Sequence, residues 1–173
     1  VAVPFFFMVT GYFVIGKPEK TRKFLKKTAI IYLASILLYL PLNLYAGNFK
    51  GLTPGAALTQ LLFEGTFYHL WYLPAALLGV LVASLLARSR AGLGIAGALY
   101  LLGLLGDSYW GLVSGVPVVS DIYNVIFSVA GYTRNGLFFA PLFLLLGAAM
   151  RGGRLPGKGV SAAGLAAAFA LML

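Results

Sequence analysis

Long apolar segments separated by short basic clusters are the feature that most constrains the fold of this chain. The apolar segments cover residues 1–16, 28–46, 69–87, 91–106, 136–150 and 159–173. A helix needs roughly 20 apolar residues to cross a bilayer, and in lipid the backbone must satisfy its own polar groups. The pattern therefore predicts an all-α, polytopic transmembrane helix bundle with about six spans.

The composition excludes an ordinary soluble domain. Only 10% of the 173 residues are charged and 61% are hydrophobic, whereas soluble chains carry about 25% charged residues. The net charge of +9 could suggest a nucleic-acid-binding protein, but the cations lie in clusters between apolar segments, as they do in the loops of membrane proteins. We expect membrane lipid as a partner, and no nucleic acid.

The distribution of the cations predicts an orientation. Eleven of the 13 Lys and Arg residues fall in three alternate connections, 17–27, 88–90 and 151–158, and the other two are Lys50 and Arg134. Three of the four acids, Glu64, Asp107 and Asp121, lie in the other connections. The positive-inside rule then places the basic connections in the cytoplasm of a multi-pass protein of the bacterial cytoplasmic membrane.

The connections on the opposite side are long and apolar. In residues 47–68, Thr53 followed by Pro54 predicts an N-cap with proline at the first helical position. A short interfacial helix is expected there, with an apolar face at Leu58, Leu61 and Leu62. Residues 107–135 carry Tyr and Trp side chains suited to the headgroup level.

The segment Gly92–Gly97 fits the dinucleotide-binding pattern G-x-G-x-x-G. That pattern indicates phosphate binding only where it follows a strand and opens a helix. Here it begins an apolar segment directly after a cytoplasmic Arg-Ser-Arg, so a packing face of small residues is the better interpretation.

The densest group of cations, Lys17 to Lys27, has two interpretations. It can act as a topological signal that also contacts anionic lipid. It can also bind the phosphates of a cytoplasmic acyl donor such as coenzyme A, because phosphates need clustered cations. The residues predicted to bind the donor are Arg22, Lys23, Lys26 and Lys27.

The segment Glu64 to Leu73 is the most concentrated polar and aromatic group and holds the only histidine, His69. A histidine at the outer end of a span can be a proton shuttle, a ligand-binding group or an interfacial polar residue. One histidine and scattered acids supply no metal-ligand set, so no metal site is predicted. A Ser-His-Asp arrangement cannot be assembled either.

Three motifs together resemble those of the acyltransferase-3 family of integral membrane proteins. Val3 to Phe13, with the sequence VPFFFMVTGYF, resembles the family's second-helix signature. His69-Leu70-Trp71-Tyr72-Leu73 resembles its His-Leu-Trp motif, and Thr133 to Phe139 followed by Leu144 to Gly147 resembles a third block. Their order and spacing agree with the family over nearly the whole chain.

The resemblance implies a fold of roughly ten transmembrane helices, of which this chain is expected to be a single transmembrane domain, 1–173, truncated at both ends. It also implies transfer of an acyl group, commonly acetyl, from cytoplasmic acyl-CoA to an extracytoplasmic glycan or other cell-envelope acceptor. Acyl-CoA would be a substrate rather than a bound cofactor. The family's key histidine lies on a first helix that this chain is expected to lack, so no catalytic residue is assigned.

The resemblance also suggests site residues. Lys23 and Lys26 hold the spacing of the family's Arg-x-x-Arg pair, although lysine lacks the bidentate fork of arginine. Thr10 stands where the family usually has serine. The residues expected to line the acceptor cavity are Thr10, Glu64, His69, Trp71, Arg134 and Asn135, with His69, Trp71 and Asn135 converging at its outer mouth.

Two other functions stay open at the level of sequence. The form His-Leu-Trp-Tyr-Leu-Pro resembles the membrane half of vancomycin-resistance serine racemases at least as well, and that half is linked to serine transport. A membrane domain that transports serine or another small amino acid is therefore the alternative. A noncatalytic membrane scaffold is the third possibility.

Overall fold

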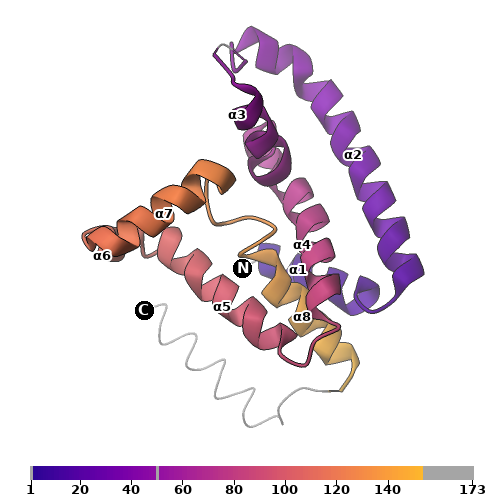
Figure 1. Ribbon diagram of the computed structural model, residues 1–173. Coiled ribbons are helices and arrows are strands. Elements are labelled where there is room, and N and C mark those ends of the chain that lie inside the picture. The colour runs from indigo at the N-terminus through magenta and orange to yellow at the C-terminus, as the bar shows by residue number, and fades with distance from the viewer. Residues whose placement is uncertain (1, 50, 154–173) are drawn as a thin grey trace.

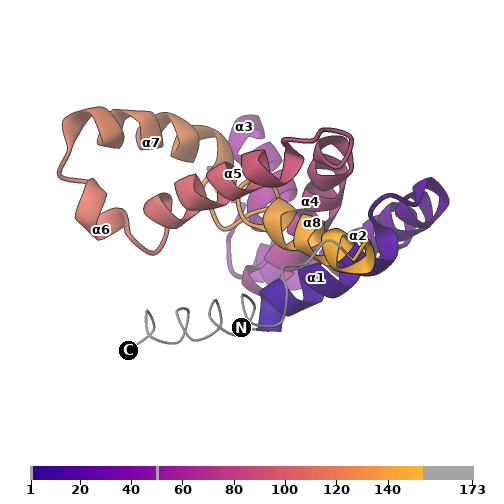
Figure 2. The same cartoon turned by 90° about the horizontal axis from the view of Figure 1, so that it is seen from below.

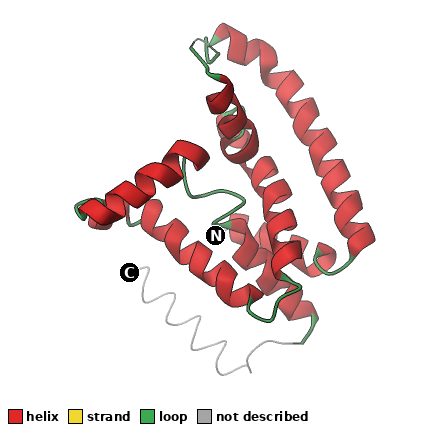
Figure 3. Ribbon diagram, in the orientation of Figure 1, coloured by secondary structure: helices red, strands yellow, loops and turns green. Residues whose placement is uncertain are grey.

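The chain is described by a computed structural model for residues 2–49 and 51–153, with only the backbone given for Tyr68 and His69. Within these ranges the structure is helical and contains no strand (Figures 1 and 3). The helices are α1 (Ala2–Val14), α2 (Pro18–Tyr45), α3 (Pro54–Thr59), α4 (Tyr72–Leu86), α5 (Gly92–Gly106), α6 (Trp110–Val113), α7 (Pro117–Ala130) and α8 (Ala140–Arg151). A π-helical turn, η1 (Gln60–Glu64), follows α3, and a 3-10 turn, η2 (Tyr68–Trp71), precedes α4.

The helix class is confirmed, but six full spans are not. The apolar segments predicted at 1–16, 28–46, 69–87, 91–106 and 136–150 each contain a helix, and the segment 159–173 lies outside the described residues. In the described part of the chain only α2 is long and apolar enough to cross a membrane, and the other apolar helices have 10–17 residues. Helices α4 and α8 begin later than their predicted segments. Residues 69–71 form a 3-10 turn before α4, and residues 136–139 belong to the loop before α8.

Helix α2 begins about ten residues before its apolar segment. Pro18 occupies its first turn, where a proline costs no hydrogen bond. The basic cluster, expected as a loop, therefore forms the first turns of α2. This corrects the prediction in a way that matters for binding, because a helix sends residues four apart to one face and adjacent residues to different faces.

Helices α1 and α8 cross in direct backbone contact. A side-chain carbon added at Gly11 would collide with the carbonyl of Leu144, and one added at Gly147 would collide with the carbonyl of Met8. The helices run parallel, because Arg151 at the end of α8 reaches the end of α1. Its Nη1 and Nη2 donate to the carbonyl oxygens of Tyr12 and Ile15, each at 2.8 Å. These bonds satisfy carbonyls that a helix end leaves open.

Helix α4 completes the core beside this crossing. Phe7, Val80 and Leu144 are fully buried where the three helices meet. The approach of α4 to α8 also depends on small residues, since a carbon added at Gly79 would lie 2.6 Å from the Cβ of Ala140. Helix α5 lies on the other side of α8, and α2 leans outward from α4 (Figure 1).

The predicted short helix after Thr53 is confirmed. The Thr53 hydroxyl oxygen accepts from the backbone N–H of Ala56 at 3.2 Å, and Pro54 is the first residue of α3. Residues 107–135, by contrast, were predicted only as an aromatic connection and contain α6 and α7. In Figure 2 these two helices lie at the edge of the molecule opposite α2.

The small-residue face predicted for Gly92–Gly97 is seen in part within the described residues. Gly92, the first residue of α5, packs against the carbonyl of Leu86, the last residue of α4. Among the described residues nothing lies within 4 Å of a carbon added at Gly94 or Gly97. Helix α5 instead buries Ala96 and Gly103.

The backbone contact between α1 and α8 generates a stability prediction. Gly147→Ala should destabilise the protein by about 1–3 kcal/mol or more, because the added carbon meets a main-chain oxygen that cannot move without its helix. The thermal unfolding midpoint of the full-length protein in detergent measures this. Gly94→Ala is the matched control and should cause no loss, because no described neighbour lies within 4 Å of the added carbon. Equal midpoints for the two variants would contradict the crossing.

Candidate functional site

Two adjoining cavities lie where α5 ends and α4 begins. The larger, here called the Glu64 cavity, has a volume of ≈ 710 Å³ and is lined by Asn48, Gln60, Glu64, Gly65, Thr66, Phe67, Trp71, Asp107, Tyr132 and Arg134. The smaller, the aromatic cavity, has a volume of ≈ 430 Å³ and is lined by Ala2, Val3, Pro4, Trp71, Tyr100, Gly103, Leu104, Asp107, Ser108, Thr133, Arg134 and Phe139. The two cavities share Trp71, Asp107 and Arg134.

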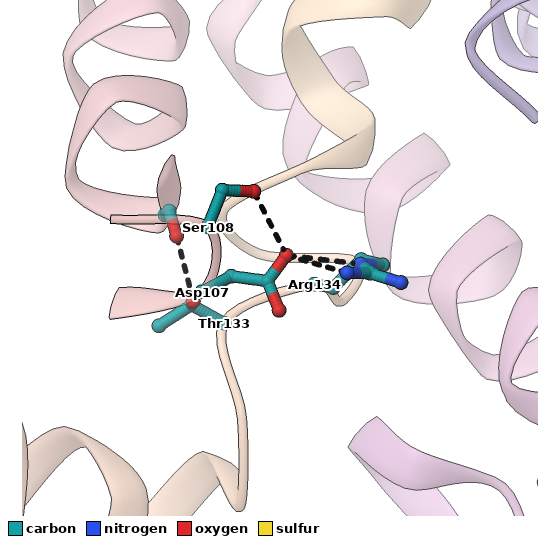
Figure 4. A network of polar contacts seen from close by, with 5 residues as sticks. Asp107, Ser108, Thr133 and Arg134 are labelled. Carbon is teal, nitrogen blue, oxygen red and sulfur yellow. Dashed lines mark hydrogen bonds and ion pairs between the residues drawn. The ribbon is translucent and has the colours of Figure 1, made fainter. Parts of the chain in front are cut away.

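An ion pair stands between the two cavities (Figure 4). Arg134 donates to Asp107 Oδ2 through Nε at 3.1 Å and through Nη2 at 2.7 Å. The neighbouring Thr133 hydroxyl donates to the carbonyl of Gly103 at 2.7 Å. Together these bonds fix the loop before α8 to the end of α5. The Arg134 side chain is 53% exposed, so the pair contributes only about 0.2–1 kcal/mol to stability and mainly orients its two members.

Glu64 is the other acid of the larger cavity, and it is held by an unusual backbone. It ends the π-helical turn and precedes Gly65, whose φ is +81°. Gly131, with φ +68°, lies directly against the carboxylate, and a side-chain carbon there would collide with Oε1. Partial burial raises the pKa of the Glu64 carboxyl above its ordinary value. The raised pKa means that the site disfavours an uncompensated negative charge.

Tyr132 connects this acid to the loop before α8. Its hydroxyl donates to the carbonyl of Phe63 at 3.3 Å and lies 3.5 Å from that of Glu64. Burial, followed by the negative charge of Glu64, raises the pKa of Tyr132 to about 12. The phenol is therefore protonated at neutral pH and acts as a hydrogen-bond donor.

A chain of amides supports the floor of the Glu64 cavity. Asn48 donates to the side chain of Asn43 at 2.9 Å, and Asn43 donates to the carbonyl of Thr66 at 3.1 Å. The Thr66 hydroxyl itself is buried and has no hydrogen-bond partner among the described residues. Neighbouring atoms cover this hydroxyl, so it belongs to the support of the cavity floor and not to the surface that a ligand would contact.

Asn135, predicted at the acceptor mouth, is fully buried and lines neither cavity. Its Nδ2 donates to the carbonyl of Tyr132 at 2.6 Å. Its Oδ1 accepts from the backbone N–H groups of Leu137 at 2.9 Å and Phe138 at 3.2 Å. Every polar atom of the side chain is therefore used to shape the loop that carries Arg134.

Of the other residues predicted to line the acceptor cavity, some line the Glu64 cavity and others do not. Glu64, Trp71 and Arg134 line the Glu64 cavity together. Thr10 lies beside the hydroxyl of Tyr72 between α1 and α4 and lines neither cavity. The side chain of His69 is not described, so its predicted convergence with Trp71 stays a prediction.

Sequence reasoning did not assign site roles to Asp107, Thr66 or Tyr132, which line the cavities as well. Asp107 could have been found, because it is one of only three acids on the side that holds Arg134. Thr66 and Tyr132 carry no comparable signal, since their positions depend on how distant loops meet.

The third cavity, here called the basic cavity, lies at the opposite ends of α1 and α4. It has a volume of ≈ 690 Å³ and is lined by Gly16, Lys17, Pro18, Thr21, Arg22, Leu25, Lys26, Ser84, Ala87 and Arg88. Of the four predicted donor-binding residues it gathers Arg22 and Lys26, one helical turn apart. Lys23 and Lys27 are exposed and do not line it.

Lys17 and Arg88 complete the basic cavity, although neither was among the four residues predicted to bind the donor. Desolvation, followed by the positive charges of Lys20 and Arg151, lowers the pKa of Lys17. The Ser84 hydroxyl is buried without a hydrogen-bond partner in the described part of the chain. Four cations from two parts of the chain surround one cavity, an arrangement suited to a multiply charged anion.

Comparisons with known proteins agree with the motifs. A family model described as an acyltransferase domain matches residues 1–173. Two amino-acid racemases of Enterococcus faecalis are 48% and 44% identical to the chain over 85% of its length. A serine/alanine racemase of Enterococcus gallinarum is 42% identical over 87% of the chain. The chain spans only 22% or 23% of these relatives' own lengths. No solved structure matches.

The bonding of Asn135 generates a prediction that separates a structural role from a binding role. Asn135→Ala should lower the free energy of unfolding by roughly 2 kcal/mol or more, since each buried N–H left unpaired costs about 1–3 kcal/mol. Thermal or denaturant unfolding of the full-length protein measures the loss. Asn124→Ala, on an exposed position of α7, is the control and should be nearly neutral. An Asn135→Ala protein that kept full stability would show that the loop does not depend on this side chain.

Proposed function

The chain belongs to the acyltransferase-3 family of integral membrane proteins, and from this premise we propose that it forms part of a membrane acyltransferase. In this proposal acyl-CoA, as the donor substrate, binds at the basic cavity on the cytoplasmic side. The acyl group, commonly acetyl in this family, passes to a glycan or other cell-envelope acceptor at the cavities on the outer side. The protein would cross the cell membrane several times, with its basic connections inside.

The basic cavity is the observation that carries this proposal. Lys17, Arg22 and Lys26 line it from the start of α2, and Arg88 lines it from the turn after α4. Phosphate groups form their strongest hydrogen bonds with such cations, and arginine can bind them through two parallel N–H groups.

The aromatic cavity supports the acceptor part of the proposal. Trp71 and Tyr100 present ring faces there, and Asp107 and Ser108 present polar atoms. A sugar suits such a surface, because an apolar ring face and a few placed polar groups fix its orientation. A general base would remove the proton of the acceptor hydroxyl as it attacks the thioester. By resemblance to the family this base would be a histidine, and we assign the role to no residue described here.

Two pairs of cations on α2 allow a test in which the two double variants have the same net charge. Arg22→Gln with Lys26→Gln should weaken binding of acetyl-CoA to the full-length protein by about tenfold or more, because each lost charge-assisted bond is worth roughly 1.5–3 kcal/mol. Lys23→Gln with Lys27→Gln removes the same charge from the same helix, but from positions that do not line the cavity. Isothermal titration in nanodiscs compares the two. Equal losses would contradict donor binding in the cavity and leave a purely topological role.

A second candidate function is the transport of a small amino acid, and one observation favours it. The Glu64 cavity holds charges of both signs, from Glu64 and Arg134, as a zwitterion requires. The similar proteins named amino-acid racemase and serine/alanine racemase act, by those names, on amino acids. A transport domain that supplies such an enzyme would fit both facts.

Uptake measurements test the second candidate. Proteoliposomes that contain the full-length protein should accumulate L-serine. Arg134→Gln should reduce the uptake about tenfold or more, because the carboxylate of the bound serine would lose its charged partner. Arg90→Gln, at an exposed position on the opposite side, serves as the control. Uptake no higher than in protein-free liposomes would exclude transport by the protein and leave acyl transfer as the proposal.

A further inference from the structure

We propose that the Glu64 carboxylate binds the protonated amine of a small substrate that enters the Glu64 cavity. The inference deepens the proposed function and rests on it in one respect, namely that the substrate of the outer side enters this cavity. It adds a chemical class, a primary amine, and a residue that recognises it.

Glu64 is the carboxylate of this cavity that is available to a ligand. The other lining acid, Asp107, is bound by Arg134 through two nitrogens. Glu64 has no ion pair or side-chain hydrogen bond to any described side chain. A partly buried carboxylate without a partner is unfavourable, and a bound cation relieves this cost.

The backbone around Glu64 holds the carboxylate in place before any ligand binds. Gly131 leaves room for Oε1 where any other residue would collide with it. The Tyr132 hydroxyl anchors the π-helical turn at the carbonyl of Phe63. A binding group that is already oriented loses little entropy when the ligand arrives.

The other walls of the cavity suit an ammonium group. Such a group has three N–H donors, and it needs acceptor oxygens around it. Asn48 and Gln60 line the cavity beside Glu64, and their side-chain amides carry such oxygens. Trp71 and Phe67 are aromatic residues of the same lining, and aromatic rings attract cations.

Arg134 offers a site for a second group on the same ligand. Its Nε and Nη2 are used on Asp107, whereas Nη1 has no hydrogen bond to a described residue. Glu64, Tyr132 and Arg134 line the same cavity. A small molecule with an amine and a carboxylate could therefore contact Glu64 and Arg134 in one cavity.

Competition binding tests the proposal on the full-length protein in nanodiscs. Labelled L-serine should bind, and Glu64→Gln should weaken its binding roughly tenfold or more. L-Lactate, which replaces the amine with a hydroxyl, should not compete. Ethanolamine distinguishes two sources of the amine. Competition by ethanolamine supports recognition of the amine alone, and its failure beside binding of serine supports recognition of amine and carboxylate together.

Two further variants keep the test interpretable. Asp121→Asn removes an exposed acid of α7 that does not line the cavity, and serine binding should be unchanged. Glu64→Asp keeps the charge and should bind serine more tightly than Glu64→Gln does, while both variants unfold at the same temperature. Equal affinity in wild type and Glu64→Gln, competition by lactate equal to that by serine, or no binding of serine and ethanolamine would each overturn the proposal. Acetyl-CoA binding at the basic cavity is measured in the same samples. It tests the donor site separately, because it does not depend on whether Glu64 binds an amine.

Discussion

The backbones of α1 and α8 touch at Gly11 and Gly147, and the positions of the other described helices follow from this contact. A parallel crossing without side chains between the helices brings their ends together, where Arg151 closes the carbonyls of α1. Helix α4 packs along the pair through a further small contact at Gly79. Lipid provides no hydrophobic drive between helices, so close packing and hydrogen bonds of this kind hold a membrane bundle together.

The crossing also separates the chemistry of the protein into two regions. Helices α1 and α4 run in one direction, so the segments that follow them, the start of α2 and the turn at Arg88, meet at one end and form the basic cavity. The loops before α4 and α8 meet at the other end, where they form the two cavities that share Trp71. The chain thus carries positive charge at one end of the bundle and charges of both signs at the other. Either proposed function, acyl transfer or amino-acid transport, would need a substrate site at the end with mixed charges.

Local signals in the sequence predicted much of the fold. Apolar length located five helices within the described residues, and Thr53 with Pro54 located the start of α3. Two errors came from treating charge and polarity as properties of loops. The basic cluster is helical because Pro18 can begin a helix ten residues before the apolar segment, and α7 was not foreseen in an apolar connection.

The site was less predictable than the fold, because it depends on contacts between distant loops. Glu64, Trp71 and Arg134 were expected near one another, and all three line one cavity. Asn135 has the same polar chemistry but shapes the loop instead, and only its hydrogen bonds reveal this. No spacing in the sequence indicates that Gly131 lies against Glu64, nor that the Thr66 hydroxyl is buried without a hydrogen-bond partner among the residues described.

The helical form of the basic cluster has a consequence for how this segment can change during evolution. Orientation in the membrane depends on the number of cations near a span and hardly on their exact positions. A cavity depends on position, and Arg22 and Lys26 point to one while Lys23 and Lys27 do not. Mutations could therefore move Lys23 and Lys27 to neighbouring positions without reversing the orientation of the protein, whereas Arg22 and Lys26 would be kept in place. Selection would then act on the number of cations over one face of this helical segment and on their exact positions over the face that lines the cavity.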